Sequence, residues 1–168
     1  MRFPMLAQLQ TKDYLTLGNA VCGFVAIVSL FPLQFGNVFS ASLFILLAIF
    51  FDFFDGKVAR RAGKANDLGK QLDSLSDAVS FGAAPALLLM SFSNSVFSLV
   101  AAIIYLCAGI VRLAFFNIQK EKGVYYGLPI PVAALVSVII FLVYPLLLSI
   151  FLVVLAFLMV SPFKIKKP

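Results

Sequence analysis

The chain has 168 residues, of which 62% are hydrophobic and only 12% are charged, and its formal net charge is +6. A soluble domain is about half apolar and about a quarter charged, so this composition excludes an ordinary water-soluble protein. Histidine is absent, which excludes a histidine base or metal ligand, and Cys22 and Cys107 lie in apolar stretches where packing is expected instead of a disulfide.

Apolar stretches follow one another along nearly the whole chain. Residues 1–10 alternate apolar and polar side chains, which predicts a short amphipathic helix on the membrane surface and no cleaved signal peptide. A hydrocarbon core needs about 20 apolar residues per helix, and spans within it must be helical because the lipid offers no water to the backbone. The predicted transmembrane helices cover residues 15–31, 38–61, 70–91, 96–117, 131–144 and 145–160. We therefore expect an all-α membrane protein, with six helices in one bundle and a single domain over residues 1–168.

The basic residues indicate the orientation of these helices. All 13 lysine and arginine residues fall at or near one end of the predicted bundle, and the connections at the other end carry no charge. Cytoplasmic connections carry the excess of Lys and Arg in membrane proteins. The pattern predicts a multi-pass protein of the cell membrane with both termini and the charged face in the cytoplasm, and no nucleic-acid partner.

Four of the seven acidic residues lie on two consecutive predicted helices. Asp52 and Asp55 are three residues apart and Asp73 and Asp77 are four apart, so each pair shares a helix face. A short loop joins the two helices, which we expect to pack antiparallel so that the four carboxylates converge. Carboxylates at membrane depth are costly and usually functional, and hard divalent cations such as Mg²⁺, Mn²⁺ or Ca²⁺ would relieve their repulsion. The alternative is that they are solvated at the membrane edge or paired with Lys and Arg.

Small residues accompany the carboxylates. Gly56, Ala59 and Gly69 remove side-chain bulk, so a flat base and ribose could approach the backbone closely. Glycine inside a helix lowers helix stability by about 1 kcal/mol relative to alanine. Two glycines so close to the carboxylates therefore suggest a functional reason for their presence. Close helix packing is an equal alternative, because small residues also line membrane helix interfaces.

The acidic stretch resembles the signature of the CDP-alcohol phosphotransferase family. The matching positions are Asp52, Asp55, Gly56, Ala59, Arg60, Gly69, Asp73 and Asp77, and the spacing agrees at each of them. Within this family the chain is most similar to the phosphatidylserine synthases, through stretches at residues 15–24, 72–86, 112–117 and 127–131. One position differs, because the Arg-Leu-Ala-Arg-Phe-Asn segment typical of these synthases has Phe115 in place of its second arginine. That difference argues against a basic pocket at position 115, whereas Arg112 and Asn117 are retained.

The resemblance implies a metal-dependent transferase that forms homodimers. Two Mg²⁺ or Mn²⁺ ions, held by Asp52, Asp55 and Asp73, would bind the diphosphate of a CDP-linked lipid. Asp77 would complete the second metal site and act as the general base. The reaction would move a phosphatidyl group from CDP-diacylglycerol, or from an archaeal ether-lipid equivalent, to the hydroxyl of L-serine and release CMP.

Further binding roles also follow from the resemblance. Gly56, Ala59 and Gly69 would line the cytidine and ribose site. Arg60 and Lys64 would meet phosphate charge, although Lys64 could equally anchor the loop at the membrane surface.

Arg112 and Asn117 are the candidate serine-binding residues. Arg112 is expected about two turns inside the cytoplasmic end of the fourth predicted helix, where its guanidinium fork suits an amino-acid carboxylate. A structural pair with an aspartate, or snorkelling to the lipid head groups, is the alternative. Asn117 would either hydrogen-bond the substrate or end the helix.

Other functions remain as alternatives. Glycerol 3-phosphate or an inositol phosphate as acceptor would require several basic residues inside the site, where Arg112 is the clear one. An ion channel or transporter would place acidic residues in both halves of the pore, and these lie at one end. A structural scaffold gives four aligned aspartates no role.

Overall fold

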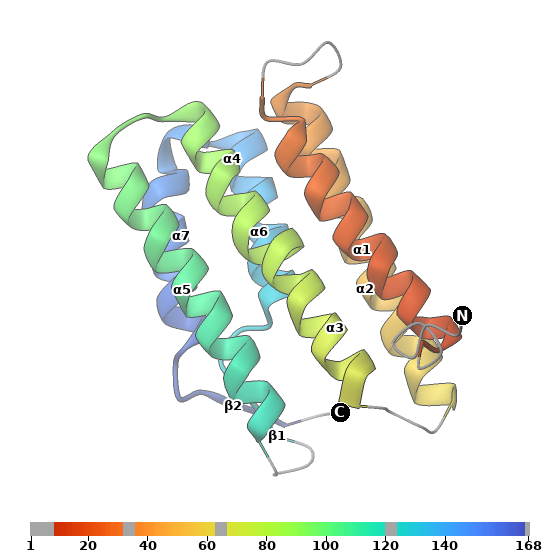
Figure 1. Cartoon of the computed structure of the whole chain (residues 1–168). Coiled ribbons are helices and arrows are strands. Elements are labelled where there is room, and N and C mark those ends of the chain that lie inside the picture. The colour runs from red at the N-terminus through yellow and green to blue at the C-terminus, as the bar shows by residue number, and fades with distance from the viewer. Residues whose placement is uncertain (1–8, 32–35, 63–66, 120–123, 167–168) are drawn as a thin grey trace.

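The computed structural model describes residues 9–31, 36–62, 67–119 and 124–166, and it is a bundle of helices (Figure 1). The helical elements are α1 (Thr11–Val28), α2 (Val38–Ala62), α3 (Asp67–Asp77), η2 (Ala78–Ala83), α4 (Ala84–Phe92), α5 (Val96–Ile118), α6 (Ile130–Val143), η3 (Pro145–Leu147) and α7 (Leu148–Met159). Because α3, η2 and α4 form one continuous rod and η3 leads into α7, these elements correspond to the six predicted helices. The amphipathic helix expected at the N-terminus falls almost entirely outside the described residues.

The helices differ in how well their length suits a membrane. Among the described residues, three are long and apolar enough to cross one, namely Val38–Lys57, Asp67–Phe92 and Val96–Ile118. Three shorter apolar helices accompany them, at Asp13–Val28, Ile130–Val143 and Pro145–Met159. The predicted helical bundle is confirmed. Of its six described helices, three are long enough and apolar enough to cross a membrane, and the other three are shorter.

Small residues are frequent in the interior of the bundle, and most of the large apolar residues that the structure describes lie on its outside. Ala26, Ala41 and Ala133 are among the fully buried side chains, while Phe39 and Val96 are 71% and 78% exposed. Lipid is as apolar as leucine, so membrane helices gain by close packing of small side chains and not by hiding large ones. This distribution is the one expected of a bundle surrounded by lipid.

The third rod contains a wider helical turn directly after Asp77. Ala78–Ala83 forms a π-helix, a rare geometry that is frequent at functional sites. Pro85 follows within α4 and has no N–H to donate to the carbonyl of Phe81. The hydroxyl of Tyr105 on α5 donates to that carbonyl at 3.0 Å, and Tyr105 is fully buried. The tyrosine therefore satisfies a backbone group at the point where the regular hydrogen-bond ladder is interrupted.

The charged end of the bundle carries a small element that the sequence did not predict. Strands β1 (Val124–Tyr126) and β2 (Lys164–Lys166) pair antiparallel at the end where α5 finishes and α3 begins (Figure 1). The connection into α6 passes through Gly127, whose φ of 66° favours glycine. A Cβ at this position would also lie 2.8 Å from the carbonyl carbon of Met159. The loop before α6 is thereby held against the end of α7.

Replacing Tyr105 with phenylalanine should lower the free energy of unfolding by about 0.5–1.5 kcal/mol, because it removes a buried hydrogen bond to the carbonyl of Phe81. Thermal unfolding in detergent measures the change. Tyr144→Phe is the matched control, since the Tyr144 side chain is 60% exposed. Equal stability of the two variants would contradict the role given to the Tyr105 hydroxyl.

Candidate metal and substrate site

The four aspartates of the sequence motif meet in one cavity. Asp52 and Asp55 lie towards the C-terminal end of α2, and Asp73 and Asp77 lie on α3. One carboxylate oxygen from each of Asp52, Asp55 and Asp73 lies within 4.8 Å of the others. Asp77 lies one turn further along α3 and lines the same cavity. The two carboxylate pairs therefore converge as their spacing predicts.

The cavity arises because α2 and the third rod separate at one end. α2 packs against η2 and α4, whereas it makes little contact with α3 in the described chain. The expected antiparallel packing of the two carboxylate helices is thus found only in their apolar halves. Four carboxylates cannot be close-packed against one another in a low-dielectric interior, and the helices diverge where the carboxylates lie.

The cavity has a volume of about 420 Å³ and an unequal distribution of charge over its wall. The lining residues are Asp52, Phe53, Asp55, Gly56, Asp73, Ser74, Asp77, Arg112, Leu113, Phe116, Pro129 and Pro131. The carboxylates come from α2 and α3, and Arg112 faces the cavity from α5. Ligand pockets of about 300–1,000 Å³ accommodate small molecules and cofactors, so this cavity is large enough for a nucleotide head group.

The carboxylates fit a hard divalent cation. Oxygen ligands lie about 2.3–2.6 Å from Ca²⁺ and about 2.0–2.1 Å from Mg²⁺, so two oxygens on one ion are at most about 5.2 Å apart for Ca²⁺ and about 4.2 Å apart for Mg²⁺. The oxygens of Asp52, Asp55 and Asp73 lie within 4.8 Å of one another, which meets the condition for Ca²⁺ and comes within about 0.6 Å of the condition for Mg²⁺. All three donors are carboxylates, the ligand type that such cations prefer. The group could therefore hold a divalent metal ion.

Helix α1 supplies hydrogen bonds to two of the aspartates. The hydroxyl of Thr16 donates to Oδ2 of Asp55 at 2.8 Å, and Nδ2 of Asn19 donates to Oδ1 of Asp77 at 3.0 Å. All four side chains are buried. Neither Thr16 nor Asn19 belongs to the acidic motif, although polar residues three apart on an apolar helix are a recognisable signal of a functional site.

The small residues of the motif take different positions. Gly56 lines the cavity, whereas Gly69 is buried on α3 and is not among the described lining residues. Ala59 and Arg60 belong to α2, and their side chains are not among those described. Lys64 lies outside the described residues.

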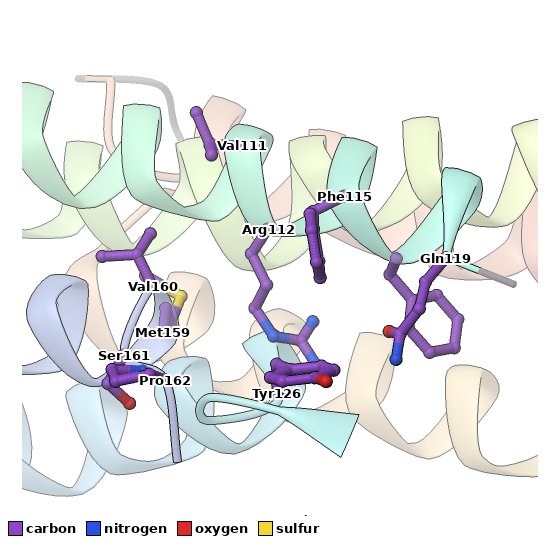
Figure 2. Close-up of a pocket in the computed structure, with 10 residues that line it drawn as sticks. Val111, Arg112, Phe115, Gln119, Tyr126, Met159, Val160, Ser161 and Pro162 are labelled. Carbon is purple, nitrogen blue, oxygen red and sulfur yellow. The ribbon is translucent and has the colours of Figure 1, made fainter. Parts of the chain in front are cut away.

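Arg112 lies between two cavities. It lines the acidic cavity and also a second pocket of about 260 Å³ beside it, and Phe116 is shared in the same way. Figure 2 shows the Arg112 side chain extending from α5 into this second pocket, which Tyr126 also lines. The rest of this second pocket is mostly apolar, with Phe115 and Met159 among its lining residues.

Asn117 connects α5 to α3. Its Nδ2 donates to the hydroxyl of Ser74 at 2.9 Å, and its backbone carbonyl accepts a hydrogen bond from Nζ of Lys70. The helix continues to Ile118, and Asn117 is not among the described residues that line the acidic cavity. Through Ser74, which does line it, Asn117 touches the cavity wall indirectly.

Comparison with known proteins gives one family. Residues 10–161 match the family described as CDP-alcohol phosphatidyltransferase. The chain is 42% identical over 159 residues to a CDP-diacylglycerol–serine O-phosphatidyltransferase of Bacillus subtilis, which covers 92% of this chain and 87% of that protein. It is 46% identical over 127 residues to the protein of the same description from Methanocaldococcus jannaschii, covering 76% of this chain and 58% of the relative.

An archaeal relative has a different description. The chain is 42% identical over 128 residues to an archaetidylserine synthase of Methanothermobacter thermautotrophicus, covering 73% of this chain and 53% of that protein. The chain thus spans little more than half the length of these two archaeal relatives.

Removing a carboxylate from the group should weaken divalent metal binding. We expect Asp52→Asn to reduce the affinity for Mn²⁺ at least about tenfold, since loss of even an outer partner of a ligand has an effect of that size. Titration of the purified protein with Mn²⁺, followed by electron paramagnetic resonance, measures the free ion. Asp67→Asn is the control, because Asp67 is exposed in the first turn of α3. Unchanged affinity in Asp52→Asn would exclude Asp52 as a ligand.

Proposed function

The chain belongs to the CDP-alcohol phosphatidyltransferase family, and on that basis we propose that it transfers a phosphatidyl group from CDP-diacylglycerol to the hydroxyl of L-serine. The observation that carries this proposal is the convergence of the four motif aspartates in one cavity that Arg112 also lines. The Bacillus subtilis relative supports serine as the acceptor, since the match covers most of both chains. An ether-linked archaeal lipid would fit the same chemistry.

In this proposal Asp52, Asp55 and Asp73 hold two Mg²⁺ or Mn²⁺ ions, and Asp77 completes the second site. When bound, the ions neutralise the charge of the CDP diphosphate, which is the main requirement of phosphoryl transfer. Asp77 also accepts the proton of the serine hydroxyl as its oxygen attacks the lipid-linked phosphorus. The new O–P bond forms as the bond from phosphorus to the CMP oxygen breaks, and CMP leaves.

The nucleotide is proposed to lie along α2. Gly56 leaves the cavity wall open, and Ala59 and Gly69 are the matching small positions of the family motif. Arg60 and Lys64 are proposed to meet the phosphate charge from the loop side of the site. The absence of side-chain bulk at Gly56, Ala59 and Gly69 would let the cytidine and ribose approach the helix backbone.

Arg112 is proposed to bind the carboxylate of serine. It lines the same cavity as the aspartates, so a serine carboxylate bound to it would leave the serine hydroxyl within that cavity beside Asp77. Asn117 is proposed to support the acceptor site through its hydrogen bond to Ser74. Arg112 is the one basic side chain among the described residues lining this cavity, and a phosphorylated acceptor such as glycerol 3-phosphate or an inositol phosphate would require more.

The membrane arrangement is part of the same proposal. We propose that all six helices cross the membrane as a single domain over residues 1–168, with both termini and the acidic cavity on the cytoplasmic side. The basic residues near the cavity end support this orientation. A homodimer is also proposed, with exposed apolar faces available for contact. The clustering of the acidic residues at one end disfavours an ion channel or transporter.

Asp77→Asn should reduce CMP release by about 10²–10⁴-fold, the contribution expected of a general base. Purified protein with CDP-diacylglycerol, Mg²⁺ or Mn²⁺ and a panel of alcohols provides the assay, with CMP as the measured product. Among the alcohols, serine should give the fastest release. Turnover retained by the variant would show that Asp77 is not the base. Faster CMP release with glycerol 3-phosphate than with serine would show that serine is not the preferred acceptor.

Arg112→Lys should raise the KM for serine about tenfold or more and leave the KM for the CDP-linked lipid close to that of the wild type. Lysine keeps the charge but loses the two-pronged contact with a carboxylate, and hydrogen bonds to charged groups contribute about 1.5–3 kcal/mol. Steady-state kinetics with each substrate varied in turn separates the two constants. An unchanged serine KM would exclude Arg112 from the acceptor site.

A further inference from the structure

Helix α1 lies where it can control the geometry of the acidic cavity, although the family motif contains none of its residues. α1 packs along α2 and also along α3 and η2, so it contacts both of the helices that carry the aspartates (Figure 1). Where α2 and α3 diverge, α1 is the helix that contacts both of them. Any fixed spacing between the two carboxylate pairs therefore depends on it.

The contact between α1 and the third rod is unusually close. A Cβ added at Gly23 would lie 2.6 Å from Cα of Ser80, so only glycine fits there without a shift. The hydroxyl of Ser80 donates to the backbone carbonyl of Asn19 at 2.9 Å. Ser80 belongs to the π-helical segment that begins directly after Asp77. The close approach at Gly23 brings α1 against the third rod within one turn of Asp77.

Each hydrogen bond from α1 occupies one oxygen of a cavity carboxylate. Thr16 donates to Oδ2 of Asp55, and Asn19 donates to Oδ1 of Asp77. A carboxylate with one oxygen held by a donor presents the other in a defined direction. Carboxylates that ligate metals are commonly held in this way by outer partners, and loss of such a partner typically reduces metal affinity or activity about 10–100-fold.

We propose that Thr16 and Asn19 are positioning residues that orient Asp55 and Asp77 towards the acidic cavity. Thr16 sets the orientation of a metal ligand. Asn19 sets the orientation of the residue that is both a ligand and the proton acceptor. This inference takes the roles of Asp55 and Asp77 from the proposed function. The two hydrogen bonds are observed in the structure and do not depend on that function.

The two residues should differ in which property of the enzyme they control. Thr16→Val keeps the size of the side chain and removes the hydroxyl, so Mn²⁺ affinity should fall about 10–100-fold. The maximal rate should return at saturating metal, because Asp77 remains oriented. Asn19→Leu should lower Mn²⁺ affinity as well, and its kcat should stay about 10–100-fold low at saturating metal while the KM values for both substrates change little.

The experiment combines Mn²⁺ titration without substrates, steady-state kinetics at saturating metal, and thermal unfolding in detergent. Thr16→Ser restores the donor and should recover wild-type Mn²⁺ affinity. Asn19→Ala, which removes the amide without adding an apolar branch, should reproduce the kcat defect of Asn19→Leu if the latter folds poorly. Ser80→Ala is the matched control, since it removes a buried hydrogen bond between the same two elements and leaves both carboxylates with their donors.

The outcomes distinguish this inference from the proposed function. Wild-type Mn²⁺ affinity in both Thr16→Val and Asn19→Leu, or an equal loss in Ser80→Ala, would overturn the positioning role and leave α1 as packing alone. Absence of CMP release from the wild-type protein with serine would overturn the proposed acceptor. The metal titration would still test Thr16 and Asn19, because it uses no substrate.

Discussion

Mutual repulsion of four carboxylates at the end of an apolar bundle is the constraint on which the rest of this structure depends. Charges in a low-dielectric interior interact strongly, and burial of unpaired charge is costly. Asp55 and Asp77 are nonetheless buried, and Asp52 and Asp73 are partly so. The chain accommodates them by separating α2 from α3 around a polar cavity and by placing hydrogen-bond donors of α1 against the buried pair. A divalent cation would offset the repulsion that remains.

The apolar half of the bundle provides the rigidity that this arrangement needs. Small buried side chains let the helices approach closely, and many large apolar residues face outward. The π-helical segment after Asp77 changes the direction in which the following residues face, and Tyr105 satisfies the carbonyl that Pro85 cannot serve. Irregular backbone at membrane depth is tolerated where neighbouring helices satisfy its polar groups, and here α5 does so.

The two neighbouring cavities suggest how one arginine can serve a small polar acceptor beside a lipid. Arg112 lines both the acidic cavity and the mostly apolar pocket next to it, with Tyr126 and Phe115 on the apolar side (Figure 2). The typical arginine of this segment is replaced by Phe115, whose ring packs edge-on against Tyr126 at a centroid distance of 5.9 Å. Among the described residues that line these two cavities, Arg112 is therefore the basic side chain, which fits its proposed role toward a single carboxylate.

The sequence by itself determined the number and order of the helices and the faces that carry the aspartates, because helical periodicity fixes which residues of one helix share a face. Asp52 with Asp55 and Asp73 with Asp77 could be paired on that basis alone. Tertiary structure decided how the helices register against one another, which no local pattern encodes. Thr16 reaches Asp55 across 39 residues of sequence and Asn19 reaches Asp77 across 58. The opening between α2 and α3, the pairing of β1 with β2 and the contact of Asn117 with Ser74 likewise depend on side chains that meet only after the bundle has packed.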